Sequence, residues 1–217
     1  MARPTGRERG GKVSRQEKDY YPTPRWVIDL LLDNYQLQDG WILEPCAGNG
    51  VICQALRERE EIGGWDGSLY AVEIREEERS TLQDLCDDVL IKDFLKTSLR
   101  DFTYPMPCAP GTIITNPPFS IAKQIIEHCF ELANDRTEII MLLRLGWLET
   151  QDRYPFWCAH PNVSLITLRD RPKFVGNGTD FAAYGWFIWS HRQQFVLPCV
   201  AAQAGKGAEH ESYLSEL

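Results

Sequence analysis

The hydrophobic residues of this chain fall into short apolar runs that alternate with amphipathic stretches. Seven runs have the length and residue types of buried strands: residues 41–46, 68–74, 88–93, 111–116, 138–144, 163–168 and 181–190. Four stretches have helical spacing: residues 20–35, 50–60, 76–85 and 120–133. In the first of these stretches, Thr23 is the expected helix cap and Pro24 the first helical residue.

This alternation predicts an α/β fold. Strand–helix–strand units form right-handed crossovers, which make the sheet mainly parallel and cover both of its faces with helices. Only the loop 169–180 separates the last two predicted strands, so we expect them to pair antiparallel at one edge. Residues 1–19 lack periodicity and predict a disordered arm. A single domain over residues 20–200 and a polar tail over residues 201–217 follow it.

Composition narrows the class of protein. With 43% hydrophobic and 25% charged residues the chain is typical of a globular protein, and no apolar stretch reaches the roughly 18–20 residues of a membrane span. The N-terminus has no apolar signal region. Seven scattered cysteines include no CxxC pair, and the four histidines do not cluster near them. We therefore expect reduced thiols, no metal site and a cytoplasmic location in a bacterial or phage-infected cell.

The net charge of −8 is unevenly distributed along the chain. Residues 1–18 contain six Lys or Arg residues against two Glu residues, so the remainder is strongly acidic. The basic arm is either a solvated tail or a segment that contacts phosphate groups. Composition leaves both interpretations open.

Acidic residues end three of the predicted strands, at the carboxyl edge where ligands of such folds bind. Glu44 precedes a tight turn with Gly48 and Gly50, and glycines there let the backbone approach a ligand closely. Glu73 ends the second strand, at the separation from the turn at which an acid accepts both hydroxyls of a ribose. Asp93 ends the third strand, near where the amino group of a purine would lie.

The ligand that these strand ends favour is a nucleoside with a cationic end. The turn is not the complete G-x-G-x-x-G pattern, and the Glu44 carboxylate would repel a pyrophosphate. The same carboxylate suits the cationic amino-acid group and sulfonium of S-adenosylmethionine. One such strand end alone is mostly an ordinary loop, but three in register favour a nucleoside cofactor, with S-adenosylmethionine first.

The quartet Asn116–Pro117–Pro118–Phe119 follows the fourth strand and reaches the same edge. The second proline restricts the first to an extended conformation, which stiffens the turn. The side-chain oxygen of Asn116 and the carbonyl oxygen of Pro117 could each accept one hydrogen of an exocyclic amino group, which would aim the nitrogen lone pair at a methyl group. Phe119 could stack on the base that carries this amino group.

Together these motifs resemble the class I S-adenosylmethionine-dependent methyltransferases that modify amino groups. NPPF is similar to the catalytic signature of the N6-adenine DNA methyltransferases, and residues 20–24 (YYPTP) are similar to their N-terminal motif. The motif order resembles the gamma arrangement, and compact phage or prophage enzymes look most similar. The resemblance covers about residues 20–190. It implies a Rossmann-like, seven-stranded sheet with an antiparallel edge hairpin, and methyl transfer to the N6 amino group of a flipped adenine in DNA.

The resemblance also implies roles for individual residues. The catalytic set is Asn116, Pro117 and Phe119. The cofactor-binding set is Tyr21, Pro22, Thr23, Glu44, Cys46, Gly48, Gly50, Glu73, Ile74, Asp93 and Phe94. Phe174 is either a second aromatic face for the base or a packing residue. Arg144, Arg171 and Lys173 are candidate contacts to nucleic acid. Arg144 either contacts phosphate or supports the catalytic edge, and a surface salt bridge is the equal alternative.

Other substrates share the same catalytic quartet. Enzymes that methylate adenines in ribosomal or transfer RNA, or a glutamine side chain of release factors, also carry it. The YPTP segment and the basic arm favour DNA, and the large helical domain of the glutamine enzymes is missing before Thr23. A non-catalytic nucleic-acid-binding protein would be expected to have lost some motifs. Without a sizeable target-recognition domain, the loops 145–162 and 170–180, the basic arm or a partner subunit would read the target sequence.

Overall fold

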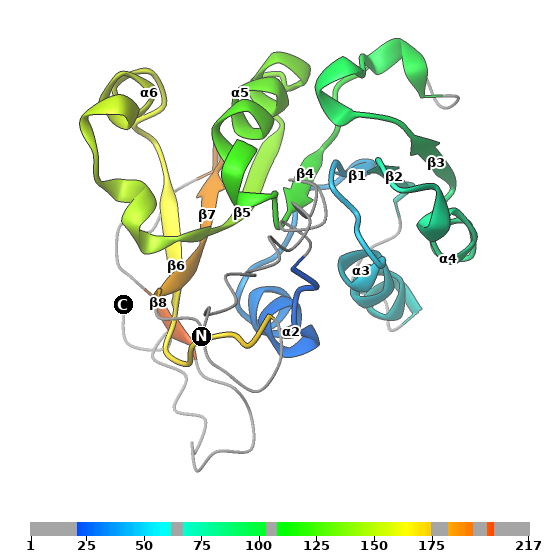
Figure 1. The fold of residues 1–217 in the computed structure, drawn as a ribbon, viewed down its shortest axis with the longest axis horizontal. Helices are drawn as coiled ribbons and strands as arrows, with labels where there is room; N and C mark the ends of the chain where they lie inside the picture. Colours follow the sequence, from blue (N-terminus) through cyan, green and yellow to red (C-terminus); the bar gives the residue numbers. More distant parts are fainter. Residues whose placement is uncertain (1–20, 62–66, 103–107, 175–181, 193–198, 202–217) are drawn as a thin grey trace, which may run out of the picture.

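Eight strands form one sheet in the computed structural model, which describes residues 21–61, 67–102, 108–174, 182–192 and 199–201 (Figure 1). The strands are β1 Ile42–Glu44, β2 Leu69–Glu73, β3 Asp88–Ile91, β4 Thr112–Thr115, β5 Glu138–Arg144, β6 Ser164–Leu168, β7 Tyr184–Trp189 and β8 Cys199–Ala201. Their order across the sheet is β3-β2-β1-β4-β5-β7-β6-β8. β7 runs antiparallel to both of its neighbours, and the other neighbouring pairs are parallel.

The predicted fold class is confirmed, with all seven predicted strands present. β6 and β7 pair antiparallel as expected, and β7 also pairs with β5, so that it lies between the two. The additional strand β8 pairs with β6. The sequence analysis expected a polar tail from residue 201 onward and did not include this strand. The predicted basic arm over residues 1–19 and nearly all of the predicted tail lie outside the described residues.

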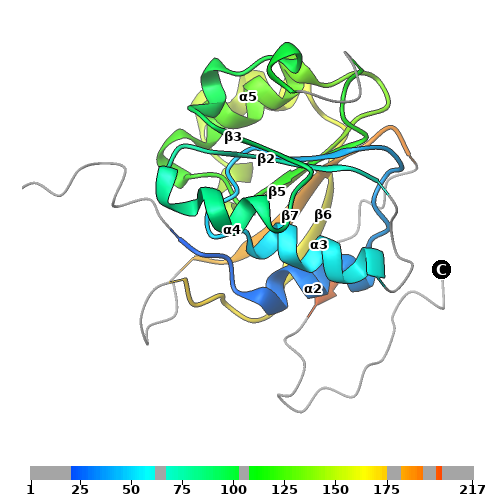
Figure 2. The same ribbon diagram turned by 90° about the vertical axis from the view of Figure 1, so that its right-hand side faces the viewer.

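Helices cover both faces of the sheet. They are α2 Arg25–Asn34, α3 Val51–Glu61, α4 Arg79–Gln83, α5 Ala122–Leu132 and α6 Tyr154–Ala159, with 3₁₀ turns η1 Glu76–Glu78, η2 Phe94–Lys96, η3 Leu99–Asp101, η4 Phe119–Ile121, η5 Leu145–Leu148 and η6 Gln151–Arg153. Figure 2 shows α2, α3 and α4 on one side of the sheet and α5 on the other. α6 lies on the side of α5, where Phe156 and Phe130 have ring centroids 5.9 Å apart. Within the described part of the chain, no helix has the length and apolar character needed to cross a membrane.

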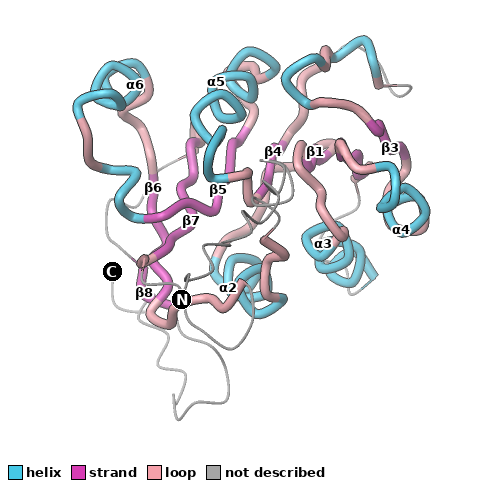
Figure 3. Tube along the Cα trace, in the orientation of Figure 1, coloured by secondary structure: helices cyan, strands magenta, loops and turns pink. Residues whose placement is uncertain are grey.

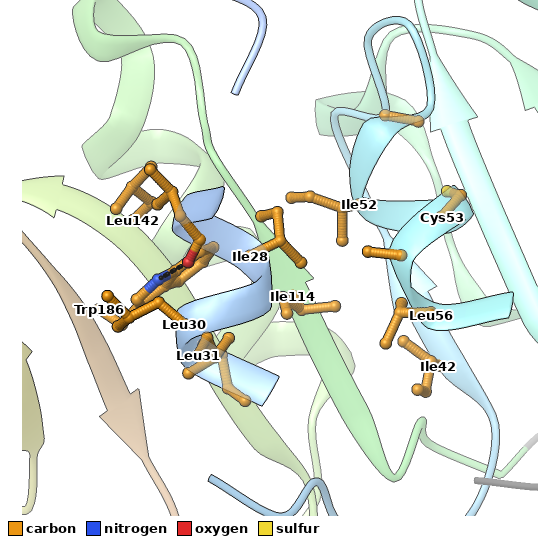
Figure 4. Packing of buried hydrophobic residues seen from close by; sticks show 14 of the residues in the cluster. Ile28, Leu30, Leu31, Ile42, Ile52, Cys53, Leu56, Ile114, Leu142 and Trp186 are labelled. Carbon is orange, nitrogen blue, oxygen red and sulfur yellow. Dashed lines mark hydrogen bonds between the residues drawn. The ribbon is translucent and has the colours of Figure 1, made fainter. Parts of the chain in front are cut away.

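A separate hydrophobic core lies on each face of the sheet. On the side of α2, Ile28 belongs to the same buried cluster as Ile114 of β4 and Trp186 of β7 (Figure 4). The indole Nε1–H of Trp186 donates to the backbone carbonyl of Val27 at 3.0 Å. These contacts fix the first turn of α2 and, with it, the segment 21–24 that precedes the helix.

Two of the predicted helices begin or end differently in the structure. Thr23 does not cap α2, because Pro24 occupies the capping position with φ −62° and ψ 134°, and no side chain caps the helix. The hydroxyl of Thr23 instead accepts a hydrogen bond from the side chain of Asn116. The predicted helix 76–85 is the turn η1 followed by the short α4. Leu82 is the single buried residue of these two elements, so no longer apolar face stabilises a continuous helix.

The predicted loop 145–162 is another correction, because it contains ordered helical turns. Figure 3 shows α6 and the short turns before it in the colour of helices. Trp147 and Phe156 are buried and hold these turns against the sheet. The two buried aromatic residues do not recur with a helical period, so the sequence pattern does not reveal the turns.

The parallel strands place four polar residues at one edge of the sheet. Glu44 is the last residue of β1 and Glu73 the last residue of β2, while Asp93 follows β3 and Asn116 follows β4. β1 lies between β2 and β4, so the end of β1 is flanked by the other two strand ends. The fold thus brings together the residues whose positions at strand ends were the basis of the functional prediction.

Candidate active site

A cavity of about 680 Å³ opens at this edge of the sheet, within the size range of small-molecule sites. Its walls come from the segment before α2, the glycine turn after β1, the ends of β2 and β3, and the turn after β4. Of the predicted catalytic and cofactor-binding residues, all but Gly50 and Phe119 line it. The predicted residues that line the cavity are Tyr21, Pro22, Thr23, Glu44, Cys46, Gly48, Glu73, Ile74, Asp93, Phe94, Asn116 and Pro117.

The glycine turn between β1 and α3 has a backbone conformation that favours glycine. Gly48 and Gly50 have φ of 59° and 78°, in the left-handed region that other residues rarely adopt. A Cβ on Gly50 would lie 2.9 Å from Cδ1 of Leu85. A side chain at Gly50 would therefore collide with Leu85, whereas Gly48 lines the cavity.

Glu73 is buried and holds the glycine turn in place. Its Oε2 accepts a hydrogen bond from the backbone N–H of Gly48 at 2.7 Å. Its Oε1 accepts from the backbone N–H and from Nε of Arg75, at 3.0 and 2.9 Å. Each carboxylate oxygen has two lone pairs, so Glu73 can support the turn and still accept a ligand hydroxyl. The predicted contact with a ribose stays a prediction.

Glu44 is the most deeply buried carboxylate of the cavity wall, with an exposed fraction of 1%. Burial raises the pKa of its carboxyl well above the ordinary value, and the neighbouring Thr115 hydroxyl offsets this only in part. Oε2 accepts no hydrogen bond from the described residues. A buried carboxylate oxygen without a partner is unfavourable, and a cationic ligand group would satisfy it.

The part of the cavity next to β3 combines a carboxylate with apolar surface. Asp93 accepts a backbone hydrogen bond within η2 and forms an ion pair of 3.0 Å with Nζ of Lys96. Phe94 is buried and packs on the ring of His128, with centroids 4.9 Å apart. Ile74 is 49% exposed although it is apolar. An apolar surface beside an acceptor is what a purine ring with an amino group requires.

The two ends of the Asn116 amide lie in different environments. Nδ2 donates to the backbone carbonyl oxygen of Tyr21 at 3.2 Å and to Oγ1 of Thr23 at 3.0 Å. Oδ1 is buried and accepts no hydrogen bond from the described residues. Asn116 therefore keeps an acceptor without a partner, next to Pro117 in the cavity wall. Such an acceptor can receive a hydrogen from a substrate.

Four aromatic rings meet at the turn after β4. Tyr21 stacks on Phe119, with centroids 5.3 Å apart and planes inclined by 28°. Phe174 contacts Tyr21 and Phe119, with centroid distances of 6.1 and 6.0 Å, and lies 5.0 Å from Tyr184. The structure thus brings the candidate Phe174 to the ring on which we expect a base to stack. Phe119 does not line the large cavity, and Tyr21 covers one of its faces.

Arg144 supports Phe119 from the end of β5. Its guanidinium carbon lies 4.7 Å from the centroid of the Phe119 ring, and its Nε donates to the hydroxyl of Tyr184 at 2.9 Å. Arg144 and Phe119 also line a second cavity of about 240 Å³. Its other lining residues are Ala122, Gly146, Trp147 and Arg153. Sequence reasoning missed this second cavity because its walls include the helical turns that were expected to be a loop.

The other two candidate contacts to nucleic acid stand apart from these cavities. Arg171 and Lys173 are exposed on the segment that leads to Phe174, and neither lines a cavity described above. The structure therefore groups Arg144 with the aromatic rings but not Arg171 or Lys173.

The large cavity also has polar lining residues that were not predicted: Asn49, Arg75, Glu76, Glu77, Lys92 and Ser120. Lys92 forms an ion pair of 2.8 Å with Asp101, and Arg75 contacts Glu73. Four of these six, Asn49, Arg75, Lys92 and Ser120, directly follow or precede a predicted site residue in the chain. Proximity to a strand end was therefore the signal that could have found them. Among the described residues, no group of His, Cys, Asp and Glu side chains is arranged to hold a metal ion.

Comparison with protein-family models and with curated proteins finds no match. Solved structures resemble the chain in fold. A proposed class I S-adenosylmethionine-dependent methyltransferase from Listeria monocytogenes has a TM-score of 0.55 at 13% identity, over 82% of this chain and 62% of that protein. A type I restriction–modification methyltransferase subunit from Streptococcus thermophilus has a TM-score of 0.57 at 12% identity, over 80% of this chain and 45% of that protein. A predicted O-methyltransferase from Agrobacterium tumefaciens has a TM-score of 0.58 at 13% identity, over 87% of this chain and 90% of that protein.

These likenesses define the fold as the Rossmann-like fold of class I methyltransferases. The chain spans about three fifths of the Listeria protein and less than half of the restriction methyltransferase subunit. At this low identity the likeness in fold does not identify a substrate for this chain, and the similar proteins differ in the substrates that their names indicate. The function must therefore be argued from the residues of the site.

Proposed function

We propose that this chain is an S-adenosylmethionine-dependent methyltransferase that modifies the N6 amino group of adenine in DNA. The observation that carries the proposal is a pair of buried acceptors in the wall of one cavity, Oε2 of Glu44 and Oδ1 of Asn116. Neither has a hydrogen-bond partner among the described residues. The first suits a cationic group of the cofactor, and the second suits the amino group that receives the methyl group.

The cavity residues fit the parts of S-adenosylmethionine, which supplies an activated methyl group on a sulfonium. Glu44 would bind the ammonium group of the methionine end, where burial makes an ion pair strong. Glu73, next to the backbone of Gly48, would accept hydrogen bonds from the ribose hydroxyls. Asp93 would accept from the adenine amino group, and the exposed side chain of Ile74 would lie on the adenine ring.

Asn116 and Pro117 would prepare the amino group of the substrate for reaction. The lone pair of an exocyclic amino nitrogen is delocalised into the ring, which makes the nitrogen a poor nucleophile. Oδ1 of Asn116 and the carbonyl oxygen of Pro117 would each accept one N–H, which makes the nitrogen more tetrahedral and directs its lone pair. A nitrogen–carbon bond then forms while the carbon–sulfur bond breaks, and its electron pair stays on sulfur. The methylated nitrogen finally loses one proton to solvent.

The aromatic residues at the turn after β4 would hold the target base. Phe119 provides a stacking face, and Phe174 provides a second aromatic surface near it. The guanidinium of Arg144 packs on Phe119 and keeps its ring in place. A base that stacks on the face of Phe119 covered by Tyr21 has to displace the ring of Tyr21.

DNA is the preferred substrate because of the YPTP segment and the basic arm, both read from the sequence. Adenine in RNA and a glutamine side chain present the same kind of NH₂ group, so the two acceptors alone suit all three substrates. Against a non-catalytic binding protein stand the two unpaired buried acceptors. They cost stability, and a protein that binds neither the cofactor nor an amino group has no use for them.

The proposal is tested by offering labelled S-adenosylmethionine with duplex DNA, single-stranded DNA, total RNA and a protein extract in parallel. Nucleoside mass spectrometry should find labelled N6-methyladenine in a DNA sample, and Asn116→Ala should abolish the label. Label confined to RNA or to glutamine would replace DNA by that substrate. A calorimetric titration that detects no binding of S-adenosylmethionine would refute the proposal that this chain is a methyltransferase.

A further inference from the structure

Residues 21–24 reach the catalytic turn through two hydrogen bonds between parts of the chain that are far apart in sequence. Nδ2 of Asn116 donates to the carbonyl oxygen of Tyr21 at 3.2 Å and to Oγ1 of Thr23 at 3.0 Å. An amide nitrogen carries two hydrogens, and two acceptors are present. One short segment therefore saturates the donor end of this amide.

The carbonyl of Tyr21 determines which end of the Asn116 amide faces the segment. A backbone carbonyl oxygen can only accept a hydrogen bond, so Oδ1 in the place of Nδ2 would bring two lone pairs together. Rotation of the amide by half a turn is thus unfavourable, and Oδ1 lies on the opposite side of the group. There it is buried without a hydrogen-bond partner among the described residues. Leaving such an acceptor unpaired is unfavourable, so the contacts at the other end have to hold it there.

The hydroxyl of Thr23 is available for this contact because α2 does not use it. Threonine just before a helix commonly caps the helix, but here Pro24 occupies the capping position and no side chain forms a cap. Thr23 is 7% exposed, so its hydroxyl is largely shielded from water. The hydroxyl meets the Asn116 amide instead of the backbone of α2.

Two prolines and the core make the acceptors rigid. Tyr21 precedes Pro22 and Thr23 precedes Pro24, and a residue before proline is restricted to extended conformations. The helix that follows is fixed by Val27, which is fully buried and whose carbonyl accepts the indole N–H from β7. The two acceptors therefore lie on a stiff segment whose position is set by the hydrophobic core.

We propose that Thr23 is a positioning residue for methyl transfer. Its hydroxyl, together with the carbonyl of Tyr21, orients the Asn116 amide so that Oδ1 is presented to the amino group of the substrate. The orientation of the amide is thus set before the substrate binds. The inference rests on the proposed function, and it assigns the Thr23 side chain a role at the Asn116 amide in place of the cofactor-binding role that the sequence resemblance implies.

The test compares Thr23→Val with Thr23→Ser. Valine keeps the shape of threonine but has no acceptor, whereas serine keeps the hydroxyl. We expect Thr23→Val to lower kcat about tenfold, as the loss of one orienting hydrogen bond implies, and Thr23→Ser to recover most of the rate. The calorimetric affinity for S-adenosylhomocysteine should stay close to that of the wild type in both variants. Loss of that affinity with an unchanged kcat at saturation would overturn the inference, because Thr23 would then act on the cofactor.

A second measurement reads the geometry without turnover. In wild-type protein labelled with ¹⁵N-asparagine, the side-chain NH₂ signal of Asn116 is assigned by its loss in Asn116→Asp. We expect both of its hydrogens to exchange slowly with solvent, and one of them to exchange faster in Thr23→Val. Fast exchange of both hydrogens in the wild type would overturn the inference even if Thr23→Val failed to fold. Absence of methyl transfer by the wild type would refute the proposed function, whereas an active wild type matched in kcat by Thr23→Val would refute the inference alone.

Discussion

The ring of Tyr21 lies on the ring of Phe119, with centroids 5.3 Å apart and planes inclined by 28°. Tyr21 comes from the segment before α2 and Phe119 from the turn after β4, so the contact joins the proposed cofactor side of the site to its proposed substrate side. Base-modifying enzymes stack an extruded base on aromatic side chains. On this face of Phe119, the ring of Tyr21 has the position that such a base would take.

Replacement of Tyr21 by alanine should therefore help the substrate to bind. The variant keeps the backbone carbonyl that contacts Asn116 but removes a stacked ring worth about 0.5–1.5 kcal/mol. We expect KM for an adenine-containing oligonucleotide to fall by about twofold to tenfold. Tyr21→Phe keeps the ring and should not show this gain. A higher KM in Tyr21→Ala would indicate instead that Tyr21 forms part of the wall that holds the base.

Asn116→Ala removes the buried acceptor and should abolish most of the methyl transfer. Loss of one transition-state acceptor or donor typically lowers kcat by about 10²–10³. Binding of S-adenosylhomocysteine should be largely retained, because Glu44 and the glycine turn remain. Single-turnover assays and calorimetry on the same preparation separate the two effects, and near-normal turnover would contradict the role of Asn116.

Asn116→Asp should also be poorly active. A carboxylate oxygen in the place of Nδ2 would lie 3.2 Å from the carbonyl oxygen of Tyr21, where two lone pairs repel each other. We expect the rate constant of methyl transfer in the same single-turnover assay to be well below that of the wild type. Wild-type activity of Asn116→Asp would show that the segment before α2 does not select the amide.

The fold and the strand-end residues were predictable because they follow from local patterns. Strands covered on both faces are buried along their whole length and mainly apolar, as β2 and β7 show, and such runs separated by amphipathic helices define the sheet. Parallel strands then carry the residues at their carboxyl ends to one edge. For this reason Glu44, Glu73 and Asn116 could be placed in one site from the sequence.

What the sequence could not predict are contacts between distant segments. Thr23 has the local features of a helix cap, but a hydrogen bond to Asn116 replaces that role. The stacking of Tyr21 on Phe119 depends in the same way on where α2 packs on the sheet. Trp147 and Phe156 are buried and hold helical turns against the sheet, without any period in the sequence.

Glu44 should make cofactor binding depend on pH. Burial raises the pKa of its carboxyl, so the ligand-free protein keeps this proton to a higher pH than an exposed glutamate would. The ammonium of the cofactor should bind the ionised form of Glu44, so the affinity for the cofactor should increase as the pH rises through the raised pKa. At a pH below that pKa, binding of the cofactor should release the proton of Glu44. Calorimetry in buffers of different ionisation enthalpy between about pH 5 and pH 8 measures both effects. Glu44→Gln should lose affinity and this pH dependence, and a flat profile for the wild type would contradict the ion pair.

The same carboxyl should lower the stability of the ligand-free protein at higher pH. The folded state holds the proton of Glu44 more tightly than the unfolded state, in which the pKa is near the ordinary 4.5. The contribution of Glu44 to the free energy of unfolding therefore falls as the pH rises from that value through the raised pKa of the folded state. Glu44→Gln does not titrate and should gain in stability over the wild type as the pH rises. Urea denaturation at about pH 5 and pH 8 would contradict this if the difference between the two proteins stayed constant.

Glu138 forms a hydrogen-bond network at the start of β5, at the opposite edge of the sheet from the cavity. It is fully buried. Its Oε1 accepts hydrogen bonds from the hydroxyl of Tyr35 at 2.8 Å, from Oγ of Ser190 at 2.7 Å and from Nε of Arg192 at 2.7 Å. Its Oε2 accepts from the backbone N–H of Gln38 at 3.0 Å. The carboxylate thus joins the end of α2 to the residues after β7.

Glu138→Ala should destabilise the protein without changing the site. Removing one partner of a buried charge network leaves the others unpaired, so we expect the free energy of unfolding to fall by about 3 kcal/mol. The matched control is Glu127→Ala, which removes an exposed ion pair with Lys123 and should cost at most about 1 kcal/mol. Because the network and the cavity lie at opposite edges of the sheet, the folded fraction of Glu138→Ala should bind S-adenosylhomocysteine with wild-type affinity. Urea denaturation followed by calorimetry measures both quantities, and equal stability of the two variants would show that the network contributes no more than a surface pair.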